Sequence, residues 1–195
     1  MMEENYLVIK GSNIHYLKKG SGPPVIILHG ASYNSTVWDQ IGLLDTVAET
    51  GYTAIAVDFP GYGKSQEGPF DGMHAFVYDF VTAMGFNKVV LIGASMGGEA
   101  ALGFAVEHPN MVKGLVLVGA IGVRYYRSKL IALEGIPILL IWGRKDTISS
   151  PENYKIVLEA VKTAKVTHIG IRHACYLDDP IKFNEEIRKF LKELR

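Results

Sequence analysis

Residues 89–99 read Val89-Val90-Leu91-Ile92-Gly93-Ala94-Ser95-Met96-Gly97-Gly98-Glu99. A β-branched apolar run is typical of a buried strand, and the small residues after it predict a sharp turn into a helix. In the pattern G-x-S-x-G the serine occupies a strained turn, and both flanking positions are glycine because side chains there would collide. The spacing predicts that the hydroxyl of Ser95 projects above a sheet as a nucleophile. The amide of Met96 would then start the helix and face an oxygen that becomes negative.

Residues at three other strand ends complete this chemistry. Residues 24–28 form an upstream apolar run, and the amide of Ala31 just after it can be a second donor to the same oxygen. Further along, Asp146 and His173 each follow an apolar run. Because the carboxyl ends of parallel strands meet at one edge of a sheet, we expect Ser95, Asp146 and His173 to lie together there. A hydroxyl, an imidazole and a carboxylate form the relay that nucleophilic catalysis requires.

Apolar runs alternate with amphipathic stretches along the rest of the chain. Eight runs are expected to form strands, at residues 6–10, 13–17, 24–28, 53–57, 88–92, 114–118, 137–142 and 165–171. Stretches beginning at Met73, Tyr154 and Ile187 keep the i, i+3, i+4 spacing of helices. Helices that alternate with strands after the third strand predict an α/β fold, with an eight-stranded, mostly parallel sheet and an antiparallel start.

Length and composition limit the classes of function. The chain has 195 residues, of which 48% are hydrophobic, and no linker or repeat interrupts it, so we expect one domain over residues 1–195. Lys plus Arg and Asp plus Glu number 20 each, which gives no basic surface for nucleic acid or an acidic membrane. The single cysteine, Cys175, and the absence of a secretory signal predict a soluble, cytoplasmic protein.

With these motifs the chain resembles the α/β-hydrolases over nearly its full length. The resemblance rests on residues 28–30, 58–65, 93–97, 143–146 and 173–180. Within this family it resembles small, carboxylesterase-like serine hydrolases, which implies a small-molecule ester, thioester or related acyl substrate and an acyl-enzyme intermediate.

The same resemblance assigns roles to the residues of the motifs. It implies Ser95 as the nucleophile, His173 as the base and Asp146 as the orienting acid. The amides of Ala31 and Met96 would form the oxyanion hole. Asp178 and Asp179, although closer to the histidine in sequence, are expected to cap the last helix instead.

One feature departs from many relatives, which carry a cap domain between the sixth strand and the strand that ends in the acid. Only residues 121–135 lie there. We therefore expect no cap domain and a shallow pocket, partly open to water. Ser32, Arg124, Tyr125 and Arg127 are the candidate substrate contacts, and a merely solvated loop is the alternative for the last three.

Two motifs imitate nucleotide-binding sites. Gly63-Lys64-Ser65 resembles the end of a P-loop, but the position of the first glycine holds Asp58, whose carboxylate would repel phosphate. Residues 92–99, with Tyr125 and Lys129 downstream, resemble a short-chain dehydrogenase, but the glycine loop follows the fifth strand rather than the first. We expect no organic cofactor and, because the histidines lack ligand spacing, no metal.

Other functions remain compatible with the pattern. A non-catalytic binding or receptor protein could use the pocket above Ser95, although such a protein needs no complete relay. A cofactor-free perhydrolase or lyase could use the same scaffold. Cys175 lies near His173 but has no strained turn or base of its own, so we expect a structural thiol.

Overall fold

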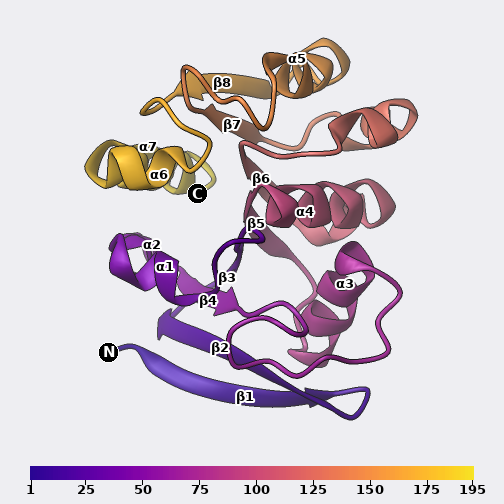
Figure 1. The fold of residues 1–195 in the computed structure, drawn as a ribbon, viewed down its shortest axis with the longest axis vertical. Coiled ribbons are helices and arrows are strands. Elements are labelled where there is room, and N and C mark those ends of the chain that lie inside the picture. Colours follow the sequence, from indigo (N-terminus) through magenta and orange to yellow (C-terminus); the bar gives the residue numbers. More distant parts are fainter.

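The computed structural model describes residues 1–195, and its centre is one eight-stranded sheet (Figure 1). The strand order is β1-β2-β4-β3-β5-β6-β7-β8. The pairs β1–β2 and β2–β4 are antiparallel, and all later pairs are parallel, which confirms the predicted antiparallel start. The strands are β1 (Glu3–Ile9), β2 (Ser12–Gly20), β3 (Pro24–Leu28), β4 (Thr53–Val57), β5 (Val89–Ala94), β6 (Val112–Val118), β7 (Ile138–Trp142) and β8 (Ala164–His168).

Helices cover both faces of the sheet (Figure 1). One layer holds α1 (Thr36–Gln40), α2 (Leu43–Glu49), α6 (Cys175–Asp178) and α7 (Pro180–Glu193). The other holds α3 (Met73–Ala83), α4 (Met96–Glu107), α5 (Pro151–Ala160) and the 3₁₀ segment η2 (Val123–Leu133), while a short turn, η1 (Pro109–Met111), leads into β6. The chain thus has the predicted α/β architecture.

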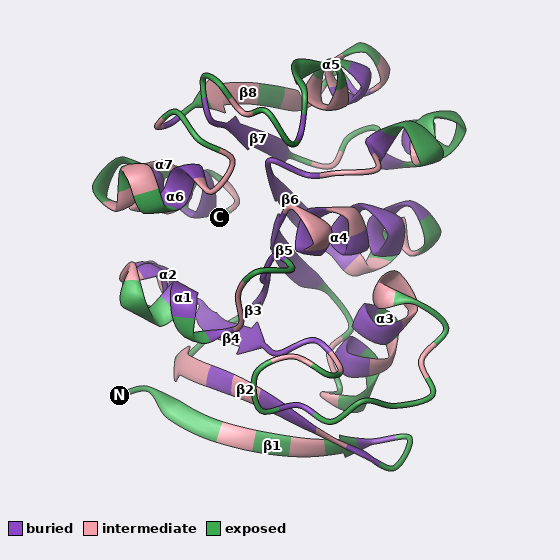
Figure 2. Cartoon of the chain, viewed as in Figure 1, coloured by how far each residue is buried: buried purple, intermediate pink, exposed green.

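The core follows from the apolar character of the central strands. All six residues of β5 are buried, as the continuous purple of the middle strands in Figure 2 illustrates. Val90 and Ile92 pack against the α7 layer, whereas Val89 and Leu91 pack against the α4 layer. Because successive side chains point to opposite faces, a strand covered on both sides must be apolar at every position.

Several strands begin or end up to three residues away from the positions expected from the sequence. The last strand ends at His168 rather than at residue 171. Gly170, with φ of 61°, turns the chain away from the sheet, and a Cβ at this position would collide with Asp178. Within residues 121–135, Val123–Leu133 form η2, which buries Val123, Leu130 and Leu133 against the rest of the fold, so no separate cap domain is present.

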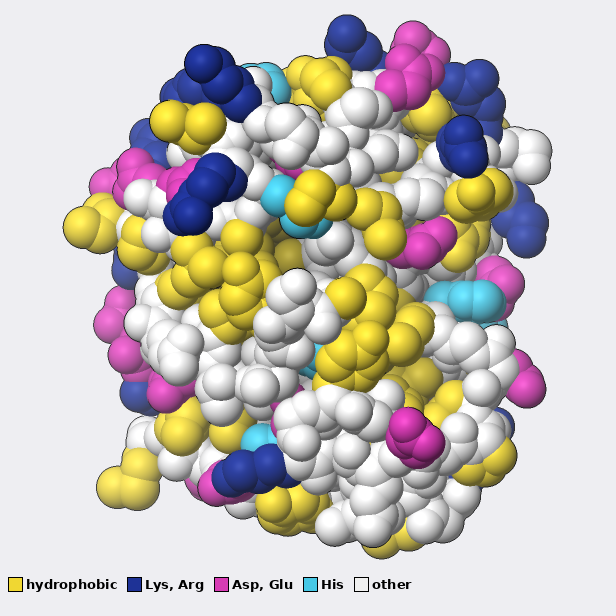
Figure 3. All heavy atoms as spheres, viewed as in Figure 1, with side chains coloured by type: hydrophobic (Ala, Val, Ile, Leu, Met, Phe, Trp, Pro, Cys, Tyr) yellow, Lys and Arg dark blue, Asp and Glu magenta, His cyan; other side chains and the backbone are white.

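The surface carries charges of both signs. In the face shown in Figure 3, basic and acidic side chains lie mainly around the rim, and hydrophobic or uncharged atoms fill most of the middle. None of the helices combines the length and the apolar character needed to cross a membrane.

Candidate active site

Ser95 stands between β5 and α4 in a strained backbone conformation, with φ of 54° and ψ of −114°. Its amide donates to the carbonyl of Val118 (2.9 Å), which ties the turn to β6. A Cβ on Gly93 would collide with the carbonyl of Gly97, and a Cβ on Gly97 would collide with the backbone at the end of β3. Both glycines are therefore required, and the close packing of β3, β5 and α4 fixes the serine at the carboxyl edge of the sheet.

Side chains from three strand ends form a continuous chain of hydrogen bonds. The Oγ of Ser95 lies 2.8 Å from Nε2 of His173, and Nδ1 of His173 lies 2.8 Å from Oδ2 of Asp146. The other oxygen of Asp146 accepts from the amides of Ile148 (2.9 Å) and Ser149 (2.8 Å). Because a carboxylate only accepts, we assign the imidazole proton to Nδ1, and this leaves Nε2 to accept from the serine hydroxyl.

The three hydrogen-bonded side chains are buried to different extents. The Asp146 side chain is 1% exposed, whereas that of His173 is 19% exposed. The carboxylate is thus enclosed, and the imidazole reaches the surface of a cavity. The arrangement can remove a proton from the hydroxyl and stabilise the resulting imidazolium.

Asp178 and Asp179 have different roles from each other. Asp179 accepts from the amide of Lys182 (3.0 Å) and caps α7, as expected. Asp178 does not cap that helix: its Oδ2 accepts from the amides of Ile171 (2.8 Å) and Arg172 (2.7 Å), and its Oδ1 accepts from Nε of Arg172 (2.7 Å). The expectation that both aspartates serve α7 is therefore wrong, because the chain turns at Gly170 and brings two free amides to Asp178.

Two backbone amides beside Ser95 are free to donate. Met96 is the first residue of α4, so its amide has no acceptor within the helix. The amide of Ala31 makes no backbone hydrogen bond. A Cβ on Gly30 would lie 3.4 Å from the Cβ of Ser95, so the segment that carries Ala31 passes directly over the serine. The sequence-predicted pair of donors is thus brought to the same place as the hydroxyl.

Buried polar contacts hold the Ala31 segment in place. Nε2 of His29 accepts from the amide of Phe59 (3.1 Å), so Nδ1 carries the proton and donates to the carbonyl of the next residue (2.8 Å). Burial lowers the pKa of His29, which keeps this ring neutral. Asp58 accepts a hydrogen bond from the amide of Ser35 (2.7 Å). Burial alone would raise the pKa of the Asp58 carboxyl, but the hydrogen bonds from the amides of Lys64 and Ser35 have the larger effect, so its pKa is lowered overall.

A cavity of about 290 Å³ opens above Ser95. Of the sequence-predicted residues, Ala31, Ser32, Ser95 and His173 line it. Four further lining residues were not among the predicted substrate contacts and supply most of its other side chains: Tyr33, Ile121, Ile148 and Tyr176. No local pattern marks them, because they come from four loops or helix ends that meet only in the folded chain.

The three predicted contacts in η2 lie elsewhere. Arg124, Tyr125 and Arg127 are exposed and do not line the cavity. Arg124 donates to the hydroxyl of Tyr125 (3.1 Å), and Arg127 lies 3.6 Å from Glu152 on α5. The structure therefore does not bring these side chains together with Ser95.

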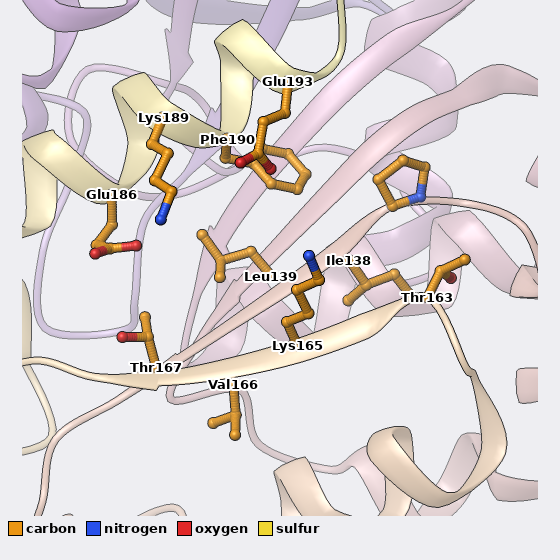
Figure 4. A pocket seen from close by; sticks show the side chains of 11 residues that line it. Ile138, Leu139, Thr163, Lys165, Val166, Thr167, Glu186, Lys189, Phe190 and Glu193 are labelled. Carbon is orange, nitrogen blue, oxygen red and sulfur yellow. The ribbon is translucent and has the colours of Figure 1, made fainter.

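A larger hollow of about 510 Å³ lies between α7 and the strands β7 and β8 (Figure 4). Lys189 of α7 and Lys165 of β8 extend into it from opposite sides, with Leu139 between them in Figure 4, whereas Val166 points to the opposite side of β8. Its lining includes no serine, cysteine or histidine. None of the threonine hydroxyls that line the hollow forms a hydrogen bond to a base, whereas Ser95 in the smaller cavity is hydrogen-bonded to His173, so the smaller cavity is the candidate active site.

Other reactive groups lie outside this site. Cys175 is fully buried, and burial, with the nearby carboxylates of Asp146 and Asp178, raises the pKa of its thiol to about 12. A thiol with such a pKa stays protonated and is a poor nucleophile at neutral pH. No group of three or more His, Cys, Asp or Glu side chains is arranged to hold a metal ion.

Comparisons with known proteins point to one family. The family described as alpha/beta hydrolase fold matches residues 23–125. The chain is 32% identical to ABHD14A of Danio rerio over 174 residues, covering 87% of this chain and 64% of that protein. It is 28% identical to the provisionally named protein-lysine deacylase ABHD14B of Rattus norvegicus over 205 residues, covering 99% of this chain and 97% of that protein.

A solved structure shares the whole fold. The crystal structure of a "predicted CIB-like hydrolase" from Thermoplasma acidophilum superimposes with a TM-score of 0.93 at 24% sequence identity and covers 99% of each chain. This likeness shows that the two proteins share their fold over nearly the whole chain. Because the family model matches more than half of the residues, the chain belongs to the α/β-hydrolase family.

Proposed function

We propose that the protein is a serine hydrolase that cleaves a carboxylic ester or a related acyl compound. The observation that carries this proposal is the unbroken chain of 2.8 Å hydrogen bonds from Ser95 through His173 to Asp146. A binding protein would need none of these contacts, and a strained serine costs on the order of 1–3 kcal/mol of stability that catalysis would justify.

In the proposed reaction the hydroxyl oxygen of Ser95 attacks the acyl carbon while its proton passes to Nε2 of His173. The negative oxygen of the tetrahedral intermediate accepts hydrogen bonds from the amides of Ala31 and Met96. The imidazolium then protonates the leaving group as the bond to the acyl carbon breaks. A water molecule, deprotonated by His173, attacks the acyl-enzyme and releases the acid and the free serine.

The leaving group is a separate question, and two candidates have support. An alcohol or thiol fits the resemblance to carboxylesterases. An amine fits the name of ABHD14B, which designates a protein-lysine deacylase and whose length this chain nearly matches. The absence of a cap is compatible with a bulky leaving group such as a lysine side chain on a protein, because the cavity reaches the surface at Ile148, which is 68% exposed.

A fluorophosphonate probe tests the proposal. It should label the wild-type protein, and labelling should be lost in Ser95→Ala but kept in Ser32→Ala, a serine of the same cavity whose hydroxyl forms no hydrogen bond to an imidazole. For the best of a series of p-nitrophenyl esters and N-acyl-lysine peptides, kcat should fall by about 10⁶ in Ser95→Ala.

The alternatives give other results. Labelling that persists in Ser95→Ala would contradict the assignment of the nucleophile. Labelling at Ser95 without hydrolysis of any ester or amide would favour a lyase or perhydrolase, and no labelling at all would favour a binding protein. The cytoplasmic location and the small-molecule acyl partner stay predictions.

A further inference from the structure

Two tyrosine hydroxyl groups at the candidate cavity have no partner within the chain. The tyrosine hydroxyls that form hydrogen bonds are those of Tyr52, Tyr62 and Tyr125. Tyr33 and Tyr176, which both line the cavity, form none. An unpaired polar group costs free energy if it is buried, so buried hydroxyls normally have a partner.

Tyr176 is the more deeply buried of the two, with only 3% of its surface exposed. Its ring is held by aromatic packing, with centroids 4.8 Å from Trp38 and 5.8 Å from Phe183. The fully enclosed side-chain atoms that lack a partner are Asn5 Nδ2, Ser35 Oγ, Trp38 Nε1 and Asn184 Oδ1, and the hydroxyl of Tyr176 is not among them. The small exposed part of Tyr176 therefore includes its hydroxyl, and Tyr176 is part of the cavity wall.

Tyr33 lies on the segment that also carries the free amide of Ala31. A turn fixes its backbone, since its amide donates to the carbonyl of Gly30 (3.1 Å). Its ring centroid is 6.2 Å from that of Tyr176, in an edge-on arrangement. The two phenols thus meet on one wall, although they come from segments more than 140 residues apart.

The remaining lining of the cavity restricts what these phenols can bind. Its other side chains are apolar, apart from Ser32 and the Ser95–His173 pair, and no lysine, arginine, aspartate or glutamate lines it. A charged substrate group would lose its water here without gaining a counter-ion, which is unfavourable. Burial, and then the neighbouring Tyr33 and Cys175, raise the pKa of Tyr176, so its hydroxyl remains a donor. The matching ligand group is an uncharged oxygen acceptor on an otherwise apolar chain.

We infer that Tyr176, together with Tyr33, donates a hydrogen bond to an uncharged oxygen of the substrate group that fills the cavity. The preferred acyl group is then a short aliphatic chain that carries a keto or similar oxygen, rather than a plain alkyl chain. This inference rests on the proposed function, because it concerns the specificity of the same site.

Matched esters and matched variants test the inference. The esters are p-nitrophenyl hexanoate and its 3-oxo, 4-oxo and 5-oxo forms, which differ only in replacing one methylene by a carbonyl. The variants are Tyr176→Phe and Tyr33→Phe, each of which removes one hydroxyl, and Tyr78→Phe, a partly exposed tyrosine of α3 outside the cavity. For each protein, kcat/KM of each oxo ester is divided by kcat/KM of hexanoate. The resulting ratio is then compared between each variant and the wild type, which cancels the intrinsic reactivity of the esters.

At one oxo position, Tyr176→Phe should lower this ratio by about three- to tenfold, the worth of one neutral hydrogen bond. Any change that Tyr176→Phe causes on plain hexanoate divides out of this ratio. Tyr33→Phe should lower the ratio at the same position by a smaller factor, and Tyr78→Phe should leave it unchanged.

Two results would overturn the inference while leaving the proposed function intact. One is a ratio that is the same in Tyr176→Phe and wild type at all three positions. The other is an equal loss on hexanoate and on the oxo esters, which would give Tyr176 a purely structural role. Failure of the proposed function looks different, since no ester would then be hydrolysed and Ser95 would not be labelled.

Discussion

At the scale of single residues, the carboxylate of Asp146 has little freedom. One of its oxygens is occupied by two backbone amides, and the other faces Nδ1 of His173. An oxygen held in this way can only accept, so it selects the imidazole tautomer whose Nε2 accepts from Ser95. The orientation of the His173 ring and its tautomer depend on the carboxylate as a hydrogen-bond acceptor more than on its charge.

Asp146→Asn should therefore lower kcat by about 10⁴ with little change in KM, as in comparable triads, because an amide NH₂ opposite Nδ1 would select the wrong tautomer. Steady-state kinetics with a p-nitrophenyl ester measure the effect, and thermal melting serves as the control for folding. A variant that keeps more than a tenth of the wild-type kcat would show that another group orients His173.

At the scale of structural elements, the short segment between β8 and α7 has two aspartates with separate duties. Asp179 caps α7 through the amide of Lys182. Asp178 binds the two amides that directly precede His173, and these hydrogen bonds from Arg172 and Ile171 lower the pKa of its carboxyl. The first aspartate thus stabilises a helix, and the second shapes the loop that presents the imidazole.

Alanine variants should separate these duties. Asp178→Ala should lower kcat by about 10- to 100-fold, because His173 would lose its fixed approach to Ser95. Asp179→Ala should leave kcat nearly unchanged and cost about 1 kcal/mol of unfolding free energy, the usual value of an N-cap. The opposite ranking, obtained by kinetics and denaturant unfolding of the same preparations, would restore the view that Asp178 only supports α7.

The lowered pKa of Asp178 also predicts a pH dependence of stability. A carboxyl whose pKa is lower in the folded than in the unfolded chain stabilises the fold above its unfolded pKa of about 3.9. That contribution is lost as the pH falls through the folded pKa. The difference in unfolding free energy between wild type and Asp178→Ala should therefore shrink between pH 6 and pH 3, whereas a constant difference would assign it to packing alone.

At the scale of the whole molecule, the missing cap decides how much of a substrate the protein can enclose. The 3₁₀ segment η2 lies against α4 and α5 and buries Val123, Leu130 and Leu133 there, and it adds no lid over Ser95. The cavity of about 290 Å³ is the space that remains. Since each buried methylene is worth about 0.8 kcal/mol, only the methylenes that fit inside this space can improve binding.

The expected consequence is a preference for short acyl chains. Across p-nitrophenyl esters from two to twelve carbons, kcat/KM should rise over the first few methylenes and then level off or fall. A rise of several-fold per methylene up to twelve carbons would instead require a deep apolar tunnel, which the lining residues do not form.

Sequence patterns were sufficient to predict the sheet and the position of the three catalytic candidates at its edge. The continuous apolar runs predicted the parallel sheet, since a strand covered on both faces has no position for a polar side chain. The glycines around Ser95 predicted the strained turn, and the strand ends placed Asp146 and His173 at the same edge. These inferences depend on the local period and on one general rule of sheet geometry, so no knowledge of distant contacts was needed.

The identity of the side chains around Ser95 depends on contacts between segments that are distant in sequence. Arg124 and Arg127 follow the sixth strand closely in sequence, yet η2 turns them to the surface, while Tyr33 and Tyr176 meet at the cavity from opposite ends of the chain. Likewise, Asp178 does not cap α7, because the turn at Gly170 brings the amide of Arg172 within hydrogen-bond distance of its carboxylate. The direction of a loop side chain depends on the free energy of packing between segments that are distant in sequence. Such contacts produce no periodic pattern of apolar residues, so they cannot be predicted from the local sequence.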